Sequence, residues 1–357
     1  MKNFFVNLGL LLTPFLLLEA VFRLMPVAYL PPIEPVNEKA PMAHFQPNVE
    51  YRWSRDWNFS VVTRKRSNNF GYIYNADYDP QARTPLLALI GDSLVEAQQV
   101  DAGKSAGELL HSALAAQGRV YTFGMSGAPL SQYLAYAEYA RNTFRADALA
   151  IVIAPNDFDE SLTKYKSDGR FFYFTDEGKL ERIDYDLHGL KGWLRHSAAL
   201  RYIMYNLDAG IRLQAWQAAQ TRPDDDKRLA DSRKAVDYFF EQLPARTGLG
   251  PERIVFLLDP LRRAIYSTEA WAKARDTFYG RVPEYFADQA ARRGYEVIDL
   301  APVFIRANAH GRTVEVAPTD SHWGAFGHEL VASQIAASKV FKSTFPVRPK
   351  LQTVSLK

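Results

Sequence analysis

The stretch from Leu86 to Val95, LLALIGDSLV, places the strongest constraint on how this chain can fold. Its first five residues form a short apolar run, which is typical of a β-strand buried on both faces when a turn signal follows. Gly91 allows the chain to change direction sharply at the end of that strand. Ser93 is therefore expected at the carboxyl edge of a sheet, at or just before the start of a helix, where open α/β sheets bind ligands.

Two interpretations of Ser93 follow from this position. The free N–H groups at a helix N-terminus stabilise a developing negative charge, which suits a nucleophilic serine. Serine is also one of the preferred helix N-cap residues, so a purely structural cap explains it equally well. The stretch alone does not choose between them.

Apolar runs and amphipathic segments alternate through most of the chain, which predicts an α/β fold with a parallel sheet and right-handed crossovers. The expected strands after Leu86–Ile90 are Val120–Phe123, Ala148–Ala154, Arg253–Leu258 and Glu296–Leu300. The expected helices are Gly103–Gln117, Leu130–Phe144, Thr268–Arg293 and Ala325–Phe341.

The alternation is interrupted between about residues 164 and 250, which we interpret as an insertion forming part of a lid or rim. It is expected to contain a hairpin over Phe171–Tyr185, helices over Gly192–Ala219 and Asp231–Leu243, and a charged break over Arg222–Arg228. Residues 51–346 then form one domain, followed by a tail over 347–357.

The N-terminus is almost entirely apolar from Phe4 to Met25, about long enough to cross a bilayer as a helix. A cleaved signal peptide is the alternative, but no small-x-small cleavage site is evident, and Glu19 favours a retained anchor. A helix of a soluble domain is a third interpretation. We predict a transmembrane anchor over residues 1–25, with the inner membrane as its partner and the body outside the cytoplasm, in the periplasm.

Residues 26–50 are rich in proline and predict an extended linker. Tyr51–Val62 then alternates partially, as a half-buried strand does. Its aromatic and cationic residues could form a platform for sugars or anions, although an edge strand packing its aromatic rings is the favoured interpretation. The residues concerned are Trp53, Trp57, Arg52, Arg55 and Arg64 to Arg66.

A serine nucleophile needs a base, an orienting acid and a site for the oxyanion. Asp320 and His322 lie together at a predicted loop before the last helix, where His322 could accept the Ser93 proton and Asp320 could orient the imidazole. Gly127 and Asn156 follow the second and third strands and could supply oxyanion donors. Taken singly, each position also fits ordinary capping, packing or turn chemistry.

Together, Gly91-Asp92-Ser93-Leu94, Gly127, Asn156-Asp157 and Asp320-x-His322 resemble the SGNH (GDSL-type) hydrolase family. The resemblance covers about residues 85–337, with the insertion over 164–250 outside it. The resemblance implies a three-layer α/β/α, flavodoxin-like fold. It implies Ser93 as nucleophile, His322 as base, Asp320 as acid, and an oxyanion hole from the Ser93 N–H, the Gly127 N–H and the Asn156 side chain. The N-terminal segments look like a membrane-anchored, extracytoplasmic branch of that family. The Asp320-x-His322-Trp323 arrangement is similar to that of alginate-type polysaccharide O-acetyltransferases and related anchored enzymes.

Two positions depart from the family pattern. Pro155 stands where a glycine usually precedes the asparagine, and the acid lies two residues before the histidine instead of three, where Thr319 stands. If Asp320 is not the acid, Asp299 is the substitute. Asp92 is expected to act structurally.

Composition excludes some classes of function. The chain has no cysteine, which excludes thiolate catalysis, and its net charge of +3 gives no support for a nucleic-acid partner. No metal-ligand motif is evident, so neither a metal nor a cofactor is expected.

The predicted function is a serine-dependent O-acetyl esterase or O-acetyltransferase that forms an acyl-serine intermediate. Its expected substrate is an acylated carbohydrate, such as envelope or exported polysaccharide, or another ester. A membrane protein that donates acyl groups is an expected partner. The alternative is a non-catalytic carbohydrate-binding or assembly subunit that retains the fold.

Overall fold

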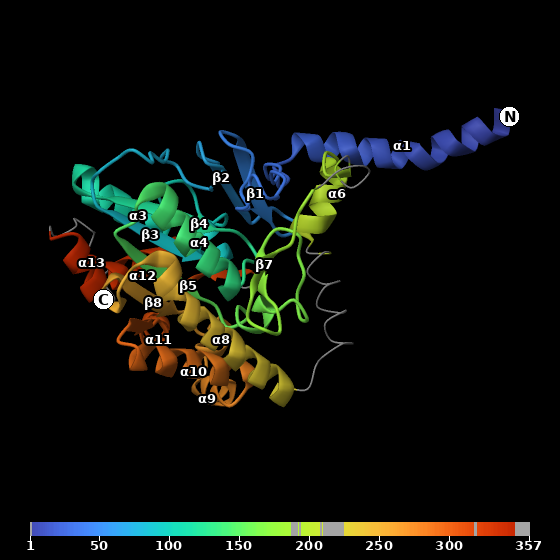
Figure 1. Ribbon diagram of the computed structural model, residues 1–357. Coiled ribbons are helices and arrows are strands. Elements are labelled where there is room, and N and C mark those ends of the chain that lie inside the picture. The colour runs from blue at the N-terminus through green and yellow to red at the C-terminus, as the bar shows by residue number, and fades with distance from the viewer. Residues whose placement is uncertain are drawn as a thin grey trace.

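Five parallel strands form the central sheet of the protein, in the order β4-β3-β5-β8-β9 (Figure 1). The computed structural model describes residues 2–186, 192, 194–207, 209, 225–317 and 320–346. Of these five strands, β3 comes first along the chain, and it lies between the second, β4, and the third, β5. This is the flavodoxin-like order. The predicted α/β fold with a parallel sheet is therefore confirmed. The strands are β3 Leu86–Gly91, β4 Arg119–Gly124, β5 Ala148–Ile153, β8 Ile254–Leu258 and β9 Glu296–Asp299.

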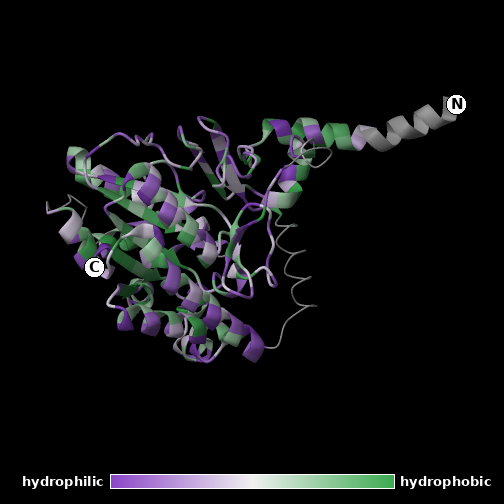
Figure 2. Ribbon diagram, viewed as in Figure 1, coloured by the Kyte–Doolittle hydropathy of each residue, from purple (hydrophilic) through white to green (hydrophobic). Residues whose placement is uncertain are grey.

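Helices cover both faces of the sheet, giving three layers. Every residue of β3 is buried, and its side chains alternate between two separate apolar clusters. Ile90 faces the cluster shared with α4 Leu130–Phe144, α8 Asp225–Thr247 and α10 Phe278–Arg292. Leu89 faces the other cluster, which includes α3 Ala106–Leu114, α11 Ala301–Ala309, α12 Ala325–Ala337 and α13 Lys339–Thr344. Hydrophobic residues accordingly concentrate in the sheet (Figure 2).

Smaller elements surround this core. Three antiparallel pairs are β1 Glu50–Arg55 with β2 Val61–Arg66, β6 Phe172–Phe174 with β7 Leu180–Arg182, and β10 Glu315–Ala317 with β11 Asp320–Trp323. The short helices are α2 Ser93–Glu96, α6 Ala198–Arg201, the π-helical turn η3 Tyr202–Asn206 and α9 Thr268–Arg275. Single 3₁₀ turns are η1 Ala115–Gln117, η2 Asp159–Ser161, η4 Pro251–Arg253 and η5 Arg262–Ala264.

Two predicted helices are each divided in the structure. The expected helix over Thr268–Arg293 is interrupted at Thr277, whose extended backbone starts α10. The expected helix over Ala325–Phe341 stops at Ser338, where the hydroxyl accepts a hydrogen bond from the Phe341 N–H at 3.0 Å and caps α13. Both breaks occur at residues suited to helix N-termini.

The region before the sheet is more folded than predicted. Tyr51–Val62 is not one strand but parts of two, β1 and β2, joined by a turn in which Asp56 adopts a positive φ of 64°. The proline-rich segment packs against the body, because Val36 and Ala43 are buried and Val36 pairs with Tyr185. This segment is therefore part of the domain's surface and does not behave as a free linker.

The segment interpreted as an insertion contributes directly to the core. The β6–β7 hairpin is present within the predicted Phe171–Tyr185 range, but α8 packs between α4 and α10 on the sheet instead of standing outside it. The predicted charged break is wrong over its last four residues, which form the first turn of α8. The predicted Gly192–Ala219 helix is described only in part, where α6 and η3 are helical, and its residues 193, 208 and 210–219 lie outside the described residues. Residues 347–357 lie outside them entirely.

The N-terminal helix is present as α1, Lys2–Leu24, and extends away from the body (Figure 1). Several of its apolar side chains are exposed, including Leu16 and Leu17 at 62% and Leu24 at 91%. Nevertheless, no helix among the described residues combines the length and apolar character needed to cross a membrane. The helix is confirmed, whereas the predicted transmembrane span is not supported.

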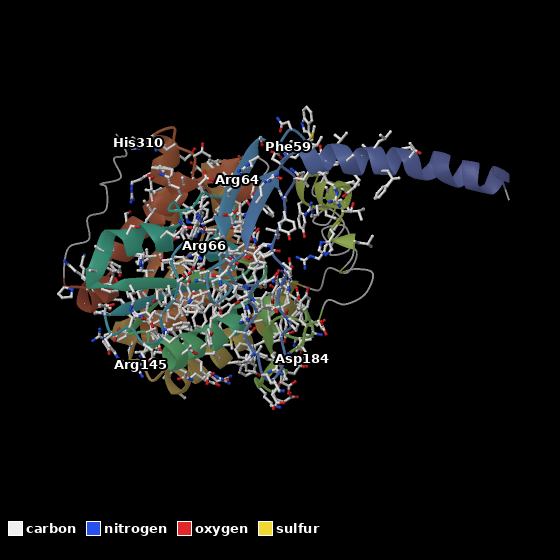
Figure 3. The ribbon with its side chains drawn as sticks, turned by 90° about the horizontal axis from the view of Figure 1, so that it is seen from above. Phe59, Arg64, Arg66, Arg145, Asp184 and His310 are labelled. Carbon is white, nitrogen blue, oxygen red and sulfur yellow. The ribbon has the colours of Figure 1, made fainter. Side chains whose placement is uncertain are left out.

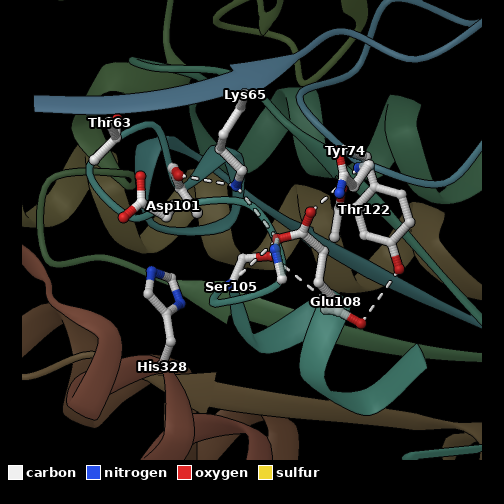
Figure 4. A network of polar contacts seen from close by, with 12 residues as sticks. Thr63, Lys65, Tyr74, Asp101, Ser105, Glu108, Thr122 and His328 are labelled. Atoms are coloured by element: carbon white, nitrogen blue, oxygen red, sulfur yellow. Dashed lines mark hydrogen bonds and ion pairs between the residues drawn. The ribbon is translucent and has the colours of Figure 1, made fainter. Parts of the chain in front are cut away.

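A buried polar network joins β2, α3 and α12 beside the sheet (Figure 4). Lys65 Nζ lies 3.4 Å from Glu108 Oε2, and both side chains are almost fully buried. The Ser105 hydroxyl donates to the same carboxylate oxygen at 2.7 Å. His328 Nδ1 accepts from the Ala106 N–H at 3.3 Å, and burial, aided by the nearby Lys65 charge, lowers the pKa of His328 to about 3. The histidine is therefore a neutral structural acceptor.

We predict that Lys65→Met lowers the free energy of unfolding by about 3 kcal/mol, because it leaves the Glu108 carboxylate buried without its cation. Urea unfolding measures this change. Lys179→Met is the matched control, since Lys179 pairs with Glu181 at an exposed site and its loss should leave the midpoint unchanged. Equal midpoints for both variants would show that the buried pair contributes nothing.

Candidate active site

The ends of three neighbouring strands bring the predicted site residues to one edge of the sheet. Gly91, at the end of β3, is in register with Gly124 of β4, and β5 flanks β3 on its other side. Ser93, Gly127 and Asn156 each follow the carboxyl end of one of these strands. Because β3 connects to a strand on either side, this edge is a topological switch point, where α/β sheets open a crevice.

Ser93 is the first residue of α2, and Asp92 is its N-cap. The Asp92 carboxylate accepts a hydrogen bond from the Leu94 N–H at 2.9 Å. The interpretation of Ser93 as the helix cap is therefore wrong, since Asp92 fills that role and acts structurally as expected. The Ser93 N–H is one of the orphan donors of the first helical turn. Its hydroxyl remains available for other contacts.

Strand β11 carries the base and the acid. Side chains two residues apart on a strand point to the same side, so Asp320 and His322 lie next to each other. Asp320 Oδ1 is 2.5 Å from His322 Nδ1 and also accepts from the His322 N–H at 3.0 Å. His322 Nε2 is 2.8 Å from Ser93 Oγ. The two-residue spacing is thus accommodated by a strand, where the sequence had predicted a loop.

The surroundings of Asp320 keep it ionised. Burial alone raises the pKa of a carboxyl group, but the hydrogen bonds and charge of His322, together with Arg55, outweigh burial and lower the Asp320 pKa to about 2. Arg55, from β1, places its Nε 4.0 Å from Asp320 Oδ2, and both side chains are buried. An ionised acid fixes the His322 tautomer with Nδ1 protonated, leaving Nε2 to accept a proton.

The substitute acid, Asp299, has a different task. Its carboxylate accepts from the Ala301 N–H at 2.9 Å at the start of α11. His322 instead contacts Asp320, so the geometry gives Asp299 no part in this chain of hydrogen bonds.

The Gly127 loop is held from both sides. Gly127 has a φ of +83°, and its carbonyl accepts from Lys166 Nζ at 2.8 Å. The preceding Ser126 donates its N–H to Glu96 Oε2 at 3.0 Å, and its hydroxyl bonds the same oxygen. Burial raises the pKa of Glu96, although these hydrogen bonds oppose that shift. The loop is therefore fixed by contacts from α2 and from Lys166.

Asn156 is positioned by its neighbour. Asp157 is fully buried and accepts from the Ala154 N–H at 2.7 Å and from the Tyr133 hydroxyl at 2.9 Å. Within the described part of the chain, neither the Gly127 N–H nor the Asn156 side-chain amide has a hydrogen-bond partner. Both groups are only partly buried and remain available as donors. Pro155 leaves this arrangement intact.

Asp259, at the end of β8, steadies the strand that carries His322. It accepts from Trp323 Nε1 at 2.8 Å and pairs with Arg262 Nε at 3.0 Å, while Arg262 also donates to the Ser321 carbonyl. Burial raises the pKa of Asp259 to about 6, against the opposing effects of Arg262 and Trp323.

Sequence reasoning did not assign the supporting residues Arg55, Glu96, Lys166 and Asp259. Each acts through a contact with a segment distant in the chain, so no local motif marks it. Asp259 offered one signal, because it is a carboxylate directly after a predicted buried strand. Glu96 offered another, as an acid in the first turn after Ser93.

The site contains a nucleophile, a base, an acid and two free donors, which is the set required for attack on an ester carbonyl. A cavity of about 300 Å³ adjoins it, lined in part by Asn156, Leu261, Arg263, Tyr279 and Ser321. No group of three or more His, Asp or Glu side chains suited to a metal ion occurs among the described residues.

Known proteins resemble the chain only distantly. No family model matches it, and no curated protein matches its sequence. Similar solved structures include a lipolytic G-D-S-L family member from Veillonella parvula DSM 2008, with 13% identity, 71% of this chain and 97% of that chain covered, and a TM-score of 0.39. A lipase/acylhydrolase from Enterococcus faecalis has 14% identity, coverages of 75% and 100%, and a TM-score of 0.40.

A carbohydrate acetylesterase family member from Sinorhizobium meliloti has 12% identity, coverages of 74% and 100%, and a TM-score of 0.38. Such values are too low to carry an argument about what this chain does. Its function has to be inferred from the geometry of its own site.

We predict that Asp320→Asn slows phosphonylation of Ser93 by a fluorophosphonate probe about 10³- to 10⁴-fold, because the amide no longer holds the imidazole in the reactive tautomer. The rate is followed by mass spectrometry of the intact protein. Asp299→Asn is the control and should react like the wild type. If Asp299→Asn instead reacted more slowly than Asp320→Asn, Asp299 would be the acid.

Asn156→Ala is expected to lower kcat for an activated ester about 10²- to 10³-fold with little change in KM, because an oxyanion donor acts mainly in the transition state. Steady-state kinetics give both constants. Asn142→Ala, at an exposed position of α4, is the control. An unchanged kcat for Asn156→Ala would remove Asn156 from the oxyanion site.

Proposed function

We propose that the protein is a serine-dependent acyl-ester enzyme of the esterase or O-acyltransferase type. One observation carries this proposal: the continuous contact from Asp320 through His322 to Ser93, with separations of 2.5 and 2.8 Å. An imidazole at this distance from a hydroxyl at the start of a helix is placed to act as a general base.

The geometry supports a two-step reaction. Ser93 Oγ attacks the ester carbonyl while its proton moves to His322 Nε2, and the oxyanion accepts hydrogen bonds from the Ser93 N–H, the Gly127 N–H and the Asn156 amide. Collapse of this intermediate breaks the bond to the leaving alcohol, which takes the proton from His322. The acyl group then passes from Ser93 to an acceptor hydroxyl. His322 takes the acceptor's proton and returns it to Ser93 Oγ as the acyl–Oγ bond breaks.

The cavity beside Asn156 supports a polar alcohol as leaving group or acceptor. Its volume of about 300 Å³ suits a small group, and Arg263 and Tyr279 at its wall offer polar contacts. A carbohydrate that carries a short acyl group fits these features. The apolar N-terminal segment supports an extracytoplasmic location for the enzyme, with a membrane-bound acyl donor as its partner. Whether water or a sugar hydroxyl accepts the acyl group decides between esterase and transferase.

Ser93→Ala tests the proposed function directly. Hydrolysis of p-nitrophenyl acetate by the full chain should fall about 10⁴- to 10⁶-fold, because Ser93 Oγ is the hydroxyl that contacts His322 Nε2. Ser343→Ala, at an exposed position of α13, is the matched control and should keep wild-type activity. Equal activity of Ser93→Ala and wild type would favour the non-catalytic, carbohydrate-binding alternative.

The acceptor can be identified in the same assay. When an oligosaccharide is added, mass spectrometry distinguishes acetylated sugar from free acetate. Acetylated product that depends on Ser93 supports the transferase, and acetate alone supports the esterase.

A further inference from the structure

A second cavity lies away from the active site, between the end of α1 and the β1–β2 pair. Its volume is about 730 Å³. Five arginine side chains line it, and Glu50 is the single carboxylate among its lining residues. The arginines are Arg23, Arg52, Arg64, Arg66 and Arg201, and we call this space the arginine cavity.

Only two of these arginines are neutralised by nearby carboxylates. Arg23 pairs with Glu19 at 2.7 Å, and Arg66 pairs with Asp77 at 2.8 Å. Glu19 is itself fully engaged, because its carboxylate also accepts from the Ser197 hydroxyl and from two N–H groups of α6.

The other three cations, Arg52, Arg64 and Arg201, have no carboxylate within 4.0 Å in the described part of the chain. The Nε groups of Arg52 and Arg201 are buried without a hydrogen-bond partner. Buried, unpaired donors of this kind are costly unless a ligand satisfies them.

The register of the β1–β2 pair increases this cost. Arg52 lies directly opposite Arg64, so two like charges face each other across neighbouring strands on the side of the cavity. Like charges in that position are destabilising. An anion between them would convert the repulsion into two favourable contacts, since guanidinium groups bind phosphate oxygens in bidentate fashion. Arg64 and Arg66 lie along this pair near the inner end of α1 (Figure 3).

Polar side chains of Glu50, Lys65 and Asn75 also line the cavity, but the part of its wall next to α1 is apolar. Phe22 and Met25, at the end of α1, line it together with Val27 and Tyr29. The exposed apolar side chains of α1 continue outward from this point. A cationic pocket that opens onto an apolar helix matches a ligand with an anionic head and an apolar tail.

We propose that the arginine cavity binds a phosphate group, held between Arg52, Arg64 and Arg201. The adjoining apolar wall identifies the phosphate as the headgroup of an anionic phospholipid whose chains lie along α1. A soluble phosphate shares the same head chemistry, and the two sources are separated by experiment. This site is independent of Ser93 and of ester chemistry.

The test uses the full chain and its Arg52→Gln/Arg64→Gln variant. Cosedimentation is measured with vesicles of phosphatidylcholine alone and of phosphatidylcholine mixed with phosphatidylglycerol. The variant should lose roughly thirtyfold of its affinity for the anionic vesicles, about 1 kcal/mol for each cation removed. Arg145→Gln/Arg292→Gln, which removes the same charge from two exposed positions elsewhere, should bind like the wild type.

The soluble arm measures the thermal midpoint with inorganic phosphate and with glycerol 3-phosphate. A rise in the wild type that is absent in the variant, without any preference for anionic vesicles, assigns the site to soluble phosphates. Loss of vesicle binding in the variant assigns it to the lipid. Arg201→Gln repeats both arms if the double variant does not fold, as judged by circular dichroism. Equal binding to both vesicle types together with no phosphate-dependent shift overturns the proposal.

Discussion

The pairing of β3 with a parallel strand on each side is the constraint on which the rest of the site depends. It places three chain reversals at one edge of the sheet, so Ser93, Gly127 and Asn156 meet without any of them being adjacent in sequence. The alternating side chains of β3 also divide the apolar residues between two helix layers, which bury the sheet on both faces. The same strand therefore positions Ser93 and contributes to the buried core that stabilises the fold.

Support around this edge comes from buried ionisable side chains that contact its loops and strands. Arg55 reaches the acid from β1, Asp259 holds Trp323 next to the base, and Glu96 secures the loop before Gly127. Each contact joins elements that the sheet alone does not connect. The hydrogen-bonding groups are thereby held before substrate arrives, which is how a site stabilises charge that develops only in the transition state.

Much of the central architecture could be predicted from the sequence, because buried parallel strands are marked by short apolar runs ending in turn residues. The same local pattern correctly predicted that Ser93, Gly127 and Asn156 follow the ends of strands. Strand β11 was missed because Asp-Ser-His-Trp has no apolar alternation, and its partner among the described residues is the short β10. Arg55 could not be assigned, since its proximity to Asp320 depends on how β1 docks, a tertiary property with no sequence motif. The helix breaks at Thr277 and Ser338 were available signals that the long periodic patterns concealed.

The location of acid and base on one strand has a consequence for how the site forms. Asp320 and His322 are neighbours by strand geometry alone, so their mutual contact needs little of the remaining fold. The contact of His322 with Ser93, by contrast, joins residues 229 positions apart in the sequence and depends on the folded sheet domain. Any local opening that releases β11 therefore removes both members from the serine as one unit. Reactivity at Ser93 consequently requires that the last part of the chain is docked, in addition to an intact acid–base pair.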